Sequence, residues 1–110
     1  SGQAFNVIYA ENDDMAKGAV AALDKANISH GVGKDVIVMG FDCNKWALEE
    51  LLNQNWNYDG QCNPYQASYI EDVIKKLESG EKIDEKTIIM DEKGFDATTI
   101  TQDDVDQFGI

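Results

Sequence analysis

The stretch Phe-Asn-Val-Ile-Tyr-Ala-Glu-Asn-Asp-Asp, residues 5–14, contains the transition that decides the fold of this chain. A run of β-forming residues gives way to a polar cluster, after which apolar residues recur with helical spacing. We interpret this as a buried strand over Phe5–Ala10, a tight turn, and a helix over residues 13–26. Asn12 or Asp13 caps the helix, because their side-chain oxygens accept the free N–H groups of its first turn. In open α/β sheets ligands bind outside the carboxyl ends of the strands, so this turn lies at a candidate binding edge.

Two more strand-and-helix units follow. Their expected elements are a strand over Asp35–Asp42 with a helix over 45–53, and a weaker strand over 56–62 with a helix over Tyr65–Glu78. The apolar run of the second strand predicts burial on both faces, and the alternation in the third predicts a sheet edge. Strands that alternate with helices predict the α/β class, with a parallel sheet, flanking helices in three layers, and right-handed crossovers.

The remaining elements give weaker signals. A short strand is expected over Thr87–Met90, a loop over Asp91–Thr98, and one or two acidic helical turns over Thr101–Phe108. Gly31 and Gly33 are candidates for positive φ in the loop that precedes the second strand. The first helix is expected to face the sheet with Met15, Ala19, Ala22, Leu23 and Ala26.

Composition limits the classes of function. The chain has 110 residues, which suits one small domain, and 43% of them are hydrophobic. Its 21 acidic and 9 basic residues give a net charge of −12, which argues against a surface that binds nucleic acid. No apolar run approaches the roughly 18 residues of a membrane span. Ser1-Gly2-Gln3 is neither basic nor apolar, so we expect no signal peptide at this position.

Two apparent motifs do not withstand a check of their spacing. Residues 30–35, His-Gly-Val-Gly-Lys-Asp, lack the first glycine and the final Ser or Thr of a phosphate-binding loop. Residues 55–60 match half of a calcium loop, but Gln66 stands where a bidentate Glu is required. His30 is the only histidine and is expected to be a solvated loop residue. The sequence thus predicts no metal site, no cofactor and no catalytic group, and we do not expect an enzyme.

Cys43 and Cys62 fit no Cys-x-x-Cys pattern. Each follows one of two consecutive predicted strands, at its carboxyl end. Two half-buried thiols and one disulfide both remain open.

Polar residues follow each of the three predicted strands at its carboxyl end. They are Asn12 and Asp13 after the first, Asp42 after the second, and Gln61, Cys62 and Asn63 after the third. Hydroxyl-rich ligands need such groups, because a carboxylate accepts two hydrogen bonds and an amide both donates and accepts. Their common location predicts a binding site.

Three segments of the chain resemble type I periplasmic sugar-binding proteins. They are Val7–Ala19, with the family's Asn-Asp-x-Met-Ala-x-Gly-Ala; Gly33–Asp42, ending in Gly-Phe-Asp; and Gln61–Pro64, with a Gln-Cys-Asn-Pro similar to the Glu-Cys-Asn-Pro of galactofuranose-binding members. The segments occur in the family's order and spacing, and the resemblance extends over residues 5–90. It implies an exported, usually lipid-anchored receptor that delivers a sugar to the permease of an ABC transporter.

The resemblance assigns roles to individual residues. It implies that Asn12 and Asp42 bind sugar hydroxyls, with Asp13 beside them. Cys62 stands where many members have a binding Gln, and the adjacent Gln61 is the alternative third contact. This departure leaves the third contact open and suggests a sugar other than ribose.

The family's proteins are longer and have two lobes, so the resemblance implies the C-terminal part of one. Residues 1–64 would form units of one lobe, residues 65–80 a crossing helix that belongs to the other, and residues 81–110 a return strand and an acidic tail. By itself such a chain exposes an apolar helix stripe and an unpaired strand edge, so we expect self-association as a dimer.

The effector-binding half of a lactose-repressor-type transcription regulator is the alternative function. Such regulators share the fold and the Asn-Asp and Gly-Phe-Asp elements. The Gln-Cys-Asn-Pro element and the acidic tail favour the receptor.

Overall fold

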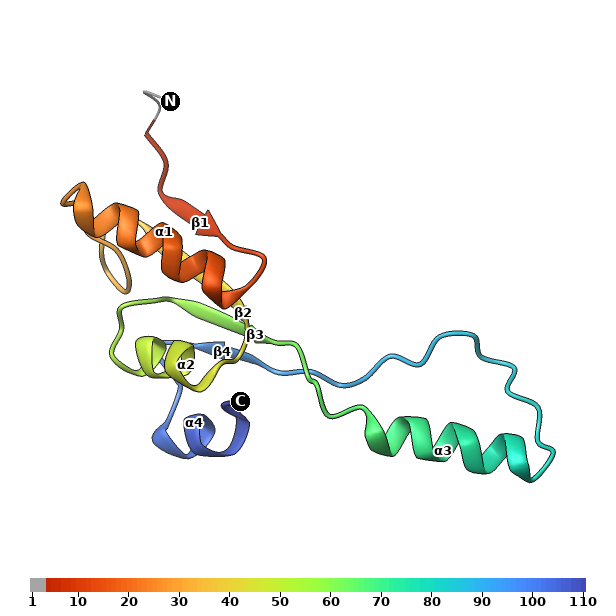
Figure 1. Cartoon of the computed structure of the whole chain (residues 1–110). Coiled ribbons are helices and arrows are strands. Elements are labelled where there is room, and N and C mark those ends of the chain that lie inside the picture. Colours follow the sequence, from red (N-terminus) through yellow and green to blue (C-terminus); the bar gives the residue numbers. More distant parts are fainter. Residues whose placement is uncertain (1–3) are drawn as a thin grey trace. The chain divides into compact units, whose positions relative to one another are not determined.

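A computed structural model describes residues 4–110. The chain is divided into two compact units, one of Ser1–Cys62 with Lys93–Ile110 and one of Asn63–Glu92 (Figure 1). The first unit contains the sheet and is described first.

The first unit consists of a four-stranded sheet and helices. Its elements are β1 (Val7–Tyr9), α1 (Asp13–Lys25), β2 (Ile37–Asp42), α2 (Lys45–Leu52), β3 (Tyr58–Gln61), β4 (Gly94–Asp96) and α4 (Gln102–Phe108). The strands lie in the order β1-β2-β3-β4; the first three are parallel and β4 is antiparallel to β3. The predicted α/β class is confirmed, with a mixed sheet in place of an entirely parallel one.

Helix α1 begins where the sequence predicts. Asn12 is its N-cap and its Oδ1 accepts a hydrogen bond from the Met15 N–H at 2.8 Å. The expected apolar face is only partly confirmed: Leu23 is buried as predicted, but Met15 is 56% exposed and Ala16, which was not expected to face the sheet, is fully buried. Alanines occur on all sides of this helix, so the sequence did not show which side packs on the sheet.

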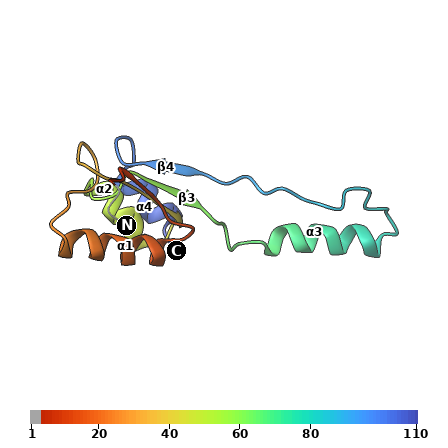
Figure 2. The ribbon, with the colours of Figure 1, turned by 90° about the horizontal axis from the view of Figure 1, so that it is seen from above.

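The helices of this unit cover one face of the sheet. Along β2, Val38 and Gly40 are buried toward the helices, whereas Ile37 is 42% exposed on the opposite face. Seen from above in Figure 2, α1, α2 and α4 lie on the same side of the strands. The prediction that this strand is buried on both faces is therefore wrong within the first unit, whose described residues form two layers and not the expected three.

The core lies between the sheet and these helices. Its fully buried side chains include Val38, Leu48, Leu51, Trp56 and Val105. α2 packs on β3, β4 and α4, so the C-terminal segment completes this core.

Two predictions about strands are corrected. β3 lies between β2 and β4 and not at the sheet edge. The fourth strand is Gly94–Asp96 and not Thr87–Met90, because Gly94 and Phe95 pair with Gly60 and Asp59 of β3. Pairing with a distant partner, and not local β propensity, decides which segment becomes a strand.

The second unit contains α3 (Ala67–Glu78) and the extended segment after it. The apolar stripe of α3 is largely exposed, with Ile70 at 54% and Leu77 at 58%. Within residues 4–110, no helix has the length and apolar composition required to cross a membrane.

Candidate functional site

The topology brings three of the predicted site residues to one edge of the sheet. Asn12 follows β1, and Asp42 and Gln61 end β2 and β3, where they are register partners. All three are partly exposed. Because β1, β2 and β3 are adjacent and parallel, their carboxyl ends form one continuous polar edge.

The side-chain amide of Asn12 has its oxygen in the helix cap and its NH₂ group available. Its carbonyl oxygen is used by the helix cap, so its NH₂ group is the end that can donate to a ligand. Gln61 is similarly engaged, because its Oε1 accepts a hydrogen bond from the Lys93 N–H at 3.2 Å.

The turn after β2 has an unusual backbone. Asp42 has φ of 126° and Cys43 has φ of 61°, although neither is glycine. Non-glycine residues with positive φ cost on the order of 1–3 kcal/mol and persist only where surrounding contacts hold them. Here the Cys43 N–H donates to Asp59, the Cys43 carbonyl oxygen accepts the Ile110 N–H at 3.1 Å, and the next residue, Asn44, donates to Asp13.

Asp13 joins the turn after β1 to the turn after β2. Its Oδ2 accepts hydrogen bonds from the backbone N–H of Asn44 at 2.9 Å and from the side-chain NH₂ of Asn44 at 3.0 Å. Asp13 is fully buried, so it is placed beneath the polar edge and not on it.

Asp59 lies next to Asp13 and was not among the residues predicted for the site. It is fully buried, and its Oδ1 accepts a hydrogen bond from the Cys43 N–H at 3.4 Å and lies 3.8 Å from the Cys43 Sγ. An Asp within a strand is an unusual choice, which is the signal that could have drawn attention to it.

Burial changes the protonation of this cluster. Burial first, then the negative charge of Asp13, raises the pKa of Asp59 to about 8. Burial also raises the pKa of Asp13, against the lowering effect of the two hydrogen bonds from Asn44. The pKa of the Cys43 thiol is likewise raised, mainly by burial and then by Asp59, so this cysteine is an inert thiol.

Cys62 is exposed beyond the end of β3, whereas Cys43 is buried under the turn. Both are free thiols in the structure. Among residues 4–110, no group of three His, Cys, Asp or Glu side chains is placed to hold a metal ion.

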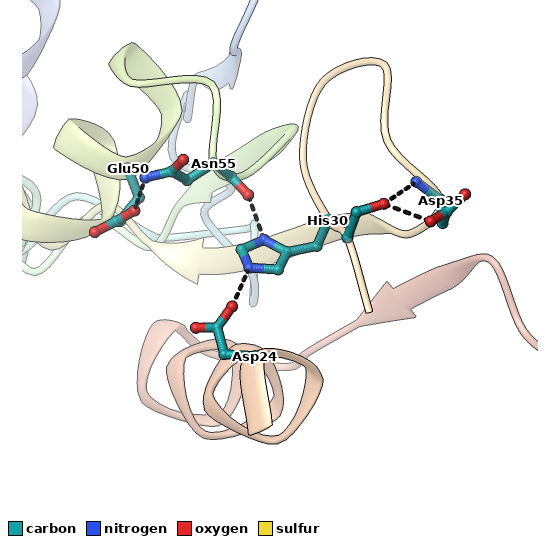
Figure 3. A network of polar contacts seen from close by, with 6 residues as sticks. Asp24, His30, Asp35, Glu50 and Asn55 are labelled. Atoms are coloured by element: carbon teal, nitrogen blue, oxygen red, sulfur yellow. Dashed lines mark hydrogen bonds and ion pairs between the residues drawn. The ribbon is translucent and has the colours of Figure 1, made fainter. Parts of the chain in front are cut away.

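A second polar cluster lies at the opposite edge of the sheet, around His30 (Figure 3). His30 Nε2 lies 3.0 Å from Asp24 Oδ1 and its Nδ1 lies 2.9 Å from the carbonyl oxygen of Asn55. Asn55 in turn donates to Glu50 Oε2 at 2.8 Å. The side chain of His30 is only 13% exposed, so the prediction of a solvated residue is wrong. The ring connects the end of α1 to the loop before β3 and therefore has a structural role.

Comparison with known proteins identifies sugar-import proteins as relatives. The chain is 33% identical over 92 residues to the fructose import binding protein FruE of Bifidobacterium longum (strain NCC 2705), covering 84% of this chain and 27% of FruE. It is 38% identical over 50 residues to the ribose import binding protein RbsB of Bacillus subtilis (strain 168), covering 46% of this chain and 14% of RbsB. No protein-family model matches the chain.

A solved structure supports the same relationship. It is the periplasmic binding protein component of the arabinose ABC transporter from Shewanella sp. ANA-3, bound to α- and β-L-arabinofuranose. The TM-score is 0.77 at 26% identity, over 89% of this chain and 32% of that one. The chain thus spans less than a third of the length of each of these proteins. The resemblance stated from the sequence motifs is confirmed, and import receptors are favoured over transcription regulators.

Proposed function

We propose that this chain, a homologue of one segment of the type I periplasmic sugar-binding proteins, supplies part of the sugar site of a transport receptor. The observation that supports this most directly is the edge formed by Asn12, Asp42 and Gln61. These partly exposed residues stand at three adjacent strand ends, in a chain that is similar to import proteins for fructose and ribose.

The chemistry of the edge suits a sugar. The Asp42 carboxylate accepts hydrogen bonds from two hydroxyls, and the NH₂ groups of Asn12 and Gln61 donate to hydroxyl oxygens. The exposed Cys62 is the further candidate contact beyond Gln61. Asp13 contributes from below, through the bonds to Asn44 that hold the two turns together.

The setting of the site is part of the same proposal. The receptor acts outside the cytoplasm and delivers its sugar to the permease of an ABC transporter. In the longer protein, the exposed apolar stripe of α3 packs on the other lobe. In the chain by itself, the same stripe promotes association into a dimer.

Isothermal titration calorimetry on the full-length protein that carries this chain tests the site, with D-fructose, D-ribose and L-arabinose as probes. Asp42→Ala should weaken binding of the preferred sugar by about 1.5–3 kcal/mol, roughly ten- to 150-fold, because a charged acceptor is lost from the site.

Asp42→Gly separates binding from folding. It removes the same carboxylate but relieves the positive φ of position 42, so the protein should keep its stability and still lose affinity. Glu49→Ala, which removes an exposed carboxylate from α2, should bind as the wild type does. Unchanged affinity in both Asp42 variants would contradict the proposal.

A further inference from the structure

Asp13 and Asp59 have no direct part in the proposed sugar contacts, yet both are fully buried directly beneath them. Buried carboxylates are costly unless they are paired with a cation or fully hydrogen-bonded. The neighbouring titratable groups that act on the pair are Asp42 and Cys43, at the end of β2 and in the turn after it. The charge of Asp42 disfavours ionisation of Asp13, whereas the hydrogen bonds from Cys43 favour ionisation of Asp59 but are outweighed by burial and by the charge of Asp13.

The hydrogen bonds of the two carboxyl groups are incomplete when both are ionised. Asp13 Oδ1 and Asp59 Oδ2 are buried and have no donor among residues 4–110. The two carboxyl groups accept hydrogen bonds from consecutive residues of one turn, Asp59 from Cys43 and Asp13 from Asn44, so their side chains are neighbours. One proton completes the arrangement, because a protonated Asp59 donates its O–H to the Asp13 carboxylate.

Each carboxyl group also holds one part of the strained turn. Asp13 accepts two hydrogen bonds from Asn44, and Asp59 accepts the N–H of Cys43. The residues they hold directly follow Asp42, whose φ of 126° sets the direction of its side chain. Asp13 itself is the first residue of α1, next to Asn12. Loss of the proton would place two negative charges in contact and push these two turns apart.

We propose that Asp13 and Asp59 share one proton and act as positioning residues that hold Asn12 and Asp42 in the arrangement that binds the ligand. The inference rests on the proposed function for its effect on sugar binding, although the shared proton does not. The raised pKa of Asp59, about 8, is consistent with a pair that is protonated near neutral pH. The pair is best described by its joint titration and not by two separate residues.

The sign of the pH dependence follows from the protonated pair. The unfolded chain releases this proton near the ordinary Asp value of 3.8, whereas the folded chain keeps it up to about pH 8. The contribution of the pair to stability is therefore largest at low pH and decreases as the pH rises through this window. Sugar affinity should stay constant up to about pH 7.5 and fall above it, at least threefold by pH 9.5.

Asp59→Asn in the full-length protein is the central variant. Its NH₂ group donates permanently to Asp13, so sugar affinity at pH 7 should stay within about twofold of the wild type and no longer fall at pH 9.5. Asp13→Asn reverses the donor and the acceptor, because its amide donates to an ionised Asp59. It replaces Asp59→Asn as the test if that variant fails to fold. Asp14→Asn removes an exposed carboxylate one residue away and should keep the pH profile of the wild type.

A spectroscopic measurement separates this inference from the proposed function. With Asp labelled by ¹³C at its carboxyl carbon, one resonance should remain that of a protonated acid at pH 6 and be absent in Asp59→Asn. If no sugar binds at any pH while this resonance is present, the proposed function fails and the shared proton stands. If every Asp is ionised at pH 6, or if Asp59→Asn and wild type lose affinity in parallel above pH 8, the inference is overturned.

Discussion

The two edges of the sheet differ in how completely their buried polar side chains are hydrogen-bonded. At the amino edge, the buried ring of His30 has an acceptor at each nitrogen, Asp24 and the carbonyl of Asn55. At the carboxyl edge, Asp13 and Asp59 are fully buried, and one oxygen of each has no donor within the part of the chain that the structure describes. The ring at the amino edge therefore has a polar partner at each nitrogen, whereas the buried carboxyl groups at the carboxyl edge are incompletely hydrogen-bonded.

Backbone strain does not by itself distinguish the edges. Positive φ occurs at Asn27, Gly31 and Gln54 on one side as well as at Asp42 and Cys43 on the other. Backbone contacts hold strained residues at both edges, and at the carboxyl edge they include the Ile110 N–H that donates to the Cys43 carbonyl oxygen at 3.1 Å. The difference is that the carboxyl edge adds two buried carboxyl groups, Asp59 on the Cys43 N–H and Asp13 on the Asn44 N–H. Variants at the amino edge should therefore change stability alone, and variants at the carboxyl edge should change ligand affinity too.

The largest effect is expected for Gly31→Ala, at the amino edge. Gly31 has φ of 99°, and a Cβ there would lie 2.3 Å from the carbonyl oxygen of Gln54 and 2.7 Å from that of Asn55. Backbone cannot yield as a flexible side chain does, so we expect a loss of about 3 kcal/mol or more, measured by urea unfolding of the full-length protein.

Gly33→Ala is the matched control for this variant. Gly33 has φ of 70°, but no atom lies within 4 Å of a Cβ added there, so the conformational cost alone, about 1–2 kcal/mol, should be seen. Equal losses in the two variants would show that the contact with the backbone of residues 54 and 55 is unimportant.

Gly40→Ala should have the next largest effect, now at the carboxyl edge. A Cβ at this position would lie 2.6 Å from Asp13 Oδ1 and 2.8 Å from Trp56 Cζ3, both in fully buried side chains. We expect a destabilisation of about 1–3 kcal/mol in urea unfolding. Because Asp13 must shift, calorimetry should also show weaker sugar binding in the folded protein.

Gly18→Ala should change the stability in the opposite direction. Gly18 lies within α1 with no atom near its would-be Cβ, so alanine should stabilise the protein by roughly 0.5–1 kcal/mol through helix propensity.

For Gly40→Ala, an unaltered sugar affinity would contradict the link that we draw between Asp13 and the binding edge.

Local signals account for the parts of the structure that could be predicted from the sequence. Asn12 caps α1, glycines take the positive φ of the loop before β2, and three parallel strands bring Asn12, Asp42 and Gln61 to one edge. Each of these follows from residues that are neighbours in the chain or from the regular βα alternation.

The parts that could not be predicted depend on distant partners. β4 forms from Gly-Phe-Asp, a segment of low β propensity, because β3 offers it an unpaired edge. His30 is held by Asp24 and Asn55 from two different elements. The pKa of Asp59 is raised by its own burial and by Asp13, which belongs to α1 far away in the chain, and no spacing rule joins the two residues.

His30→Ala tests the amino edge by removing its central ring. Two hydrogen-bonded contacts and a mostly buried side chain are lost, so we expect a destabilisation of about 1–3 kcal/mol in urea unfolding. Sugar affinity should remain within about twofold of the wild type, because no contact of this cluster reaches the polar edge. A tenfold loss of affinity in a folded variant would break the separation between the edges.

The smallest effect is expected for Asp24→Asn, which makes at the amino edge the same chemical change that Asp59→Asn makes at the carboxyl edge. Asp24 is 66% exposed, so water solvates its carboxylate, and its contact with His30 is worth no more than about 1 kcal/mol. Since the amide oxygen can still accept from the ring, sugar affinity and its pH profile should match the wild type. If Asp24→Asn changed the pH profile of sugar affinity as much as is expected for Asp59→Asn, that profile would depend on both edges. Burial of the carboxyl groups at the carboxyl edge would then not be its cause.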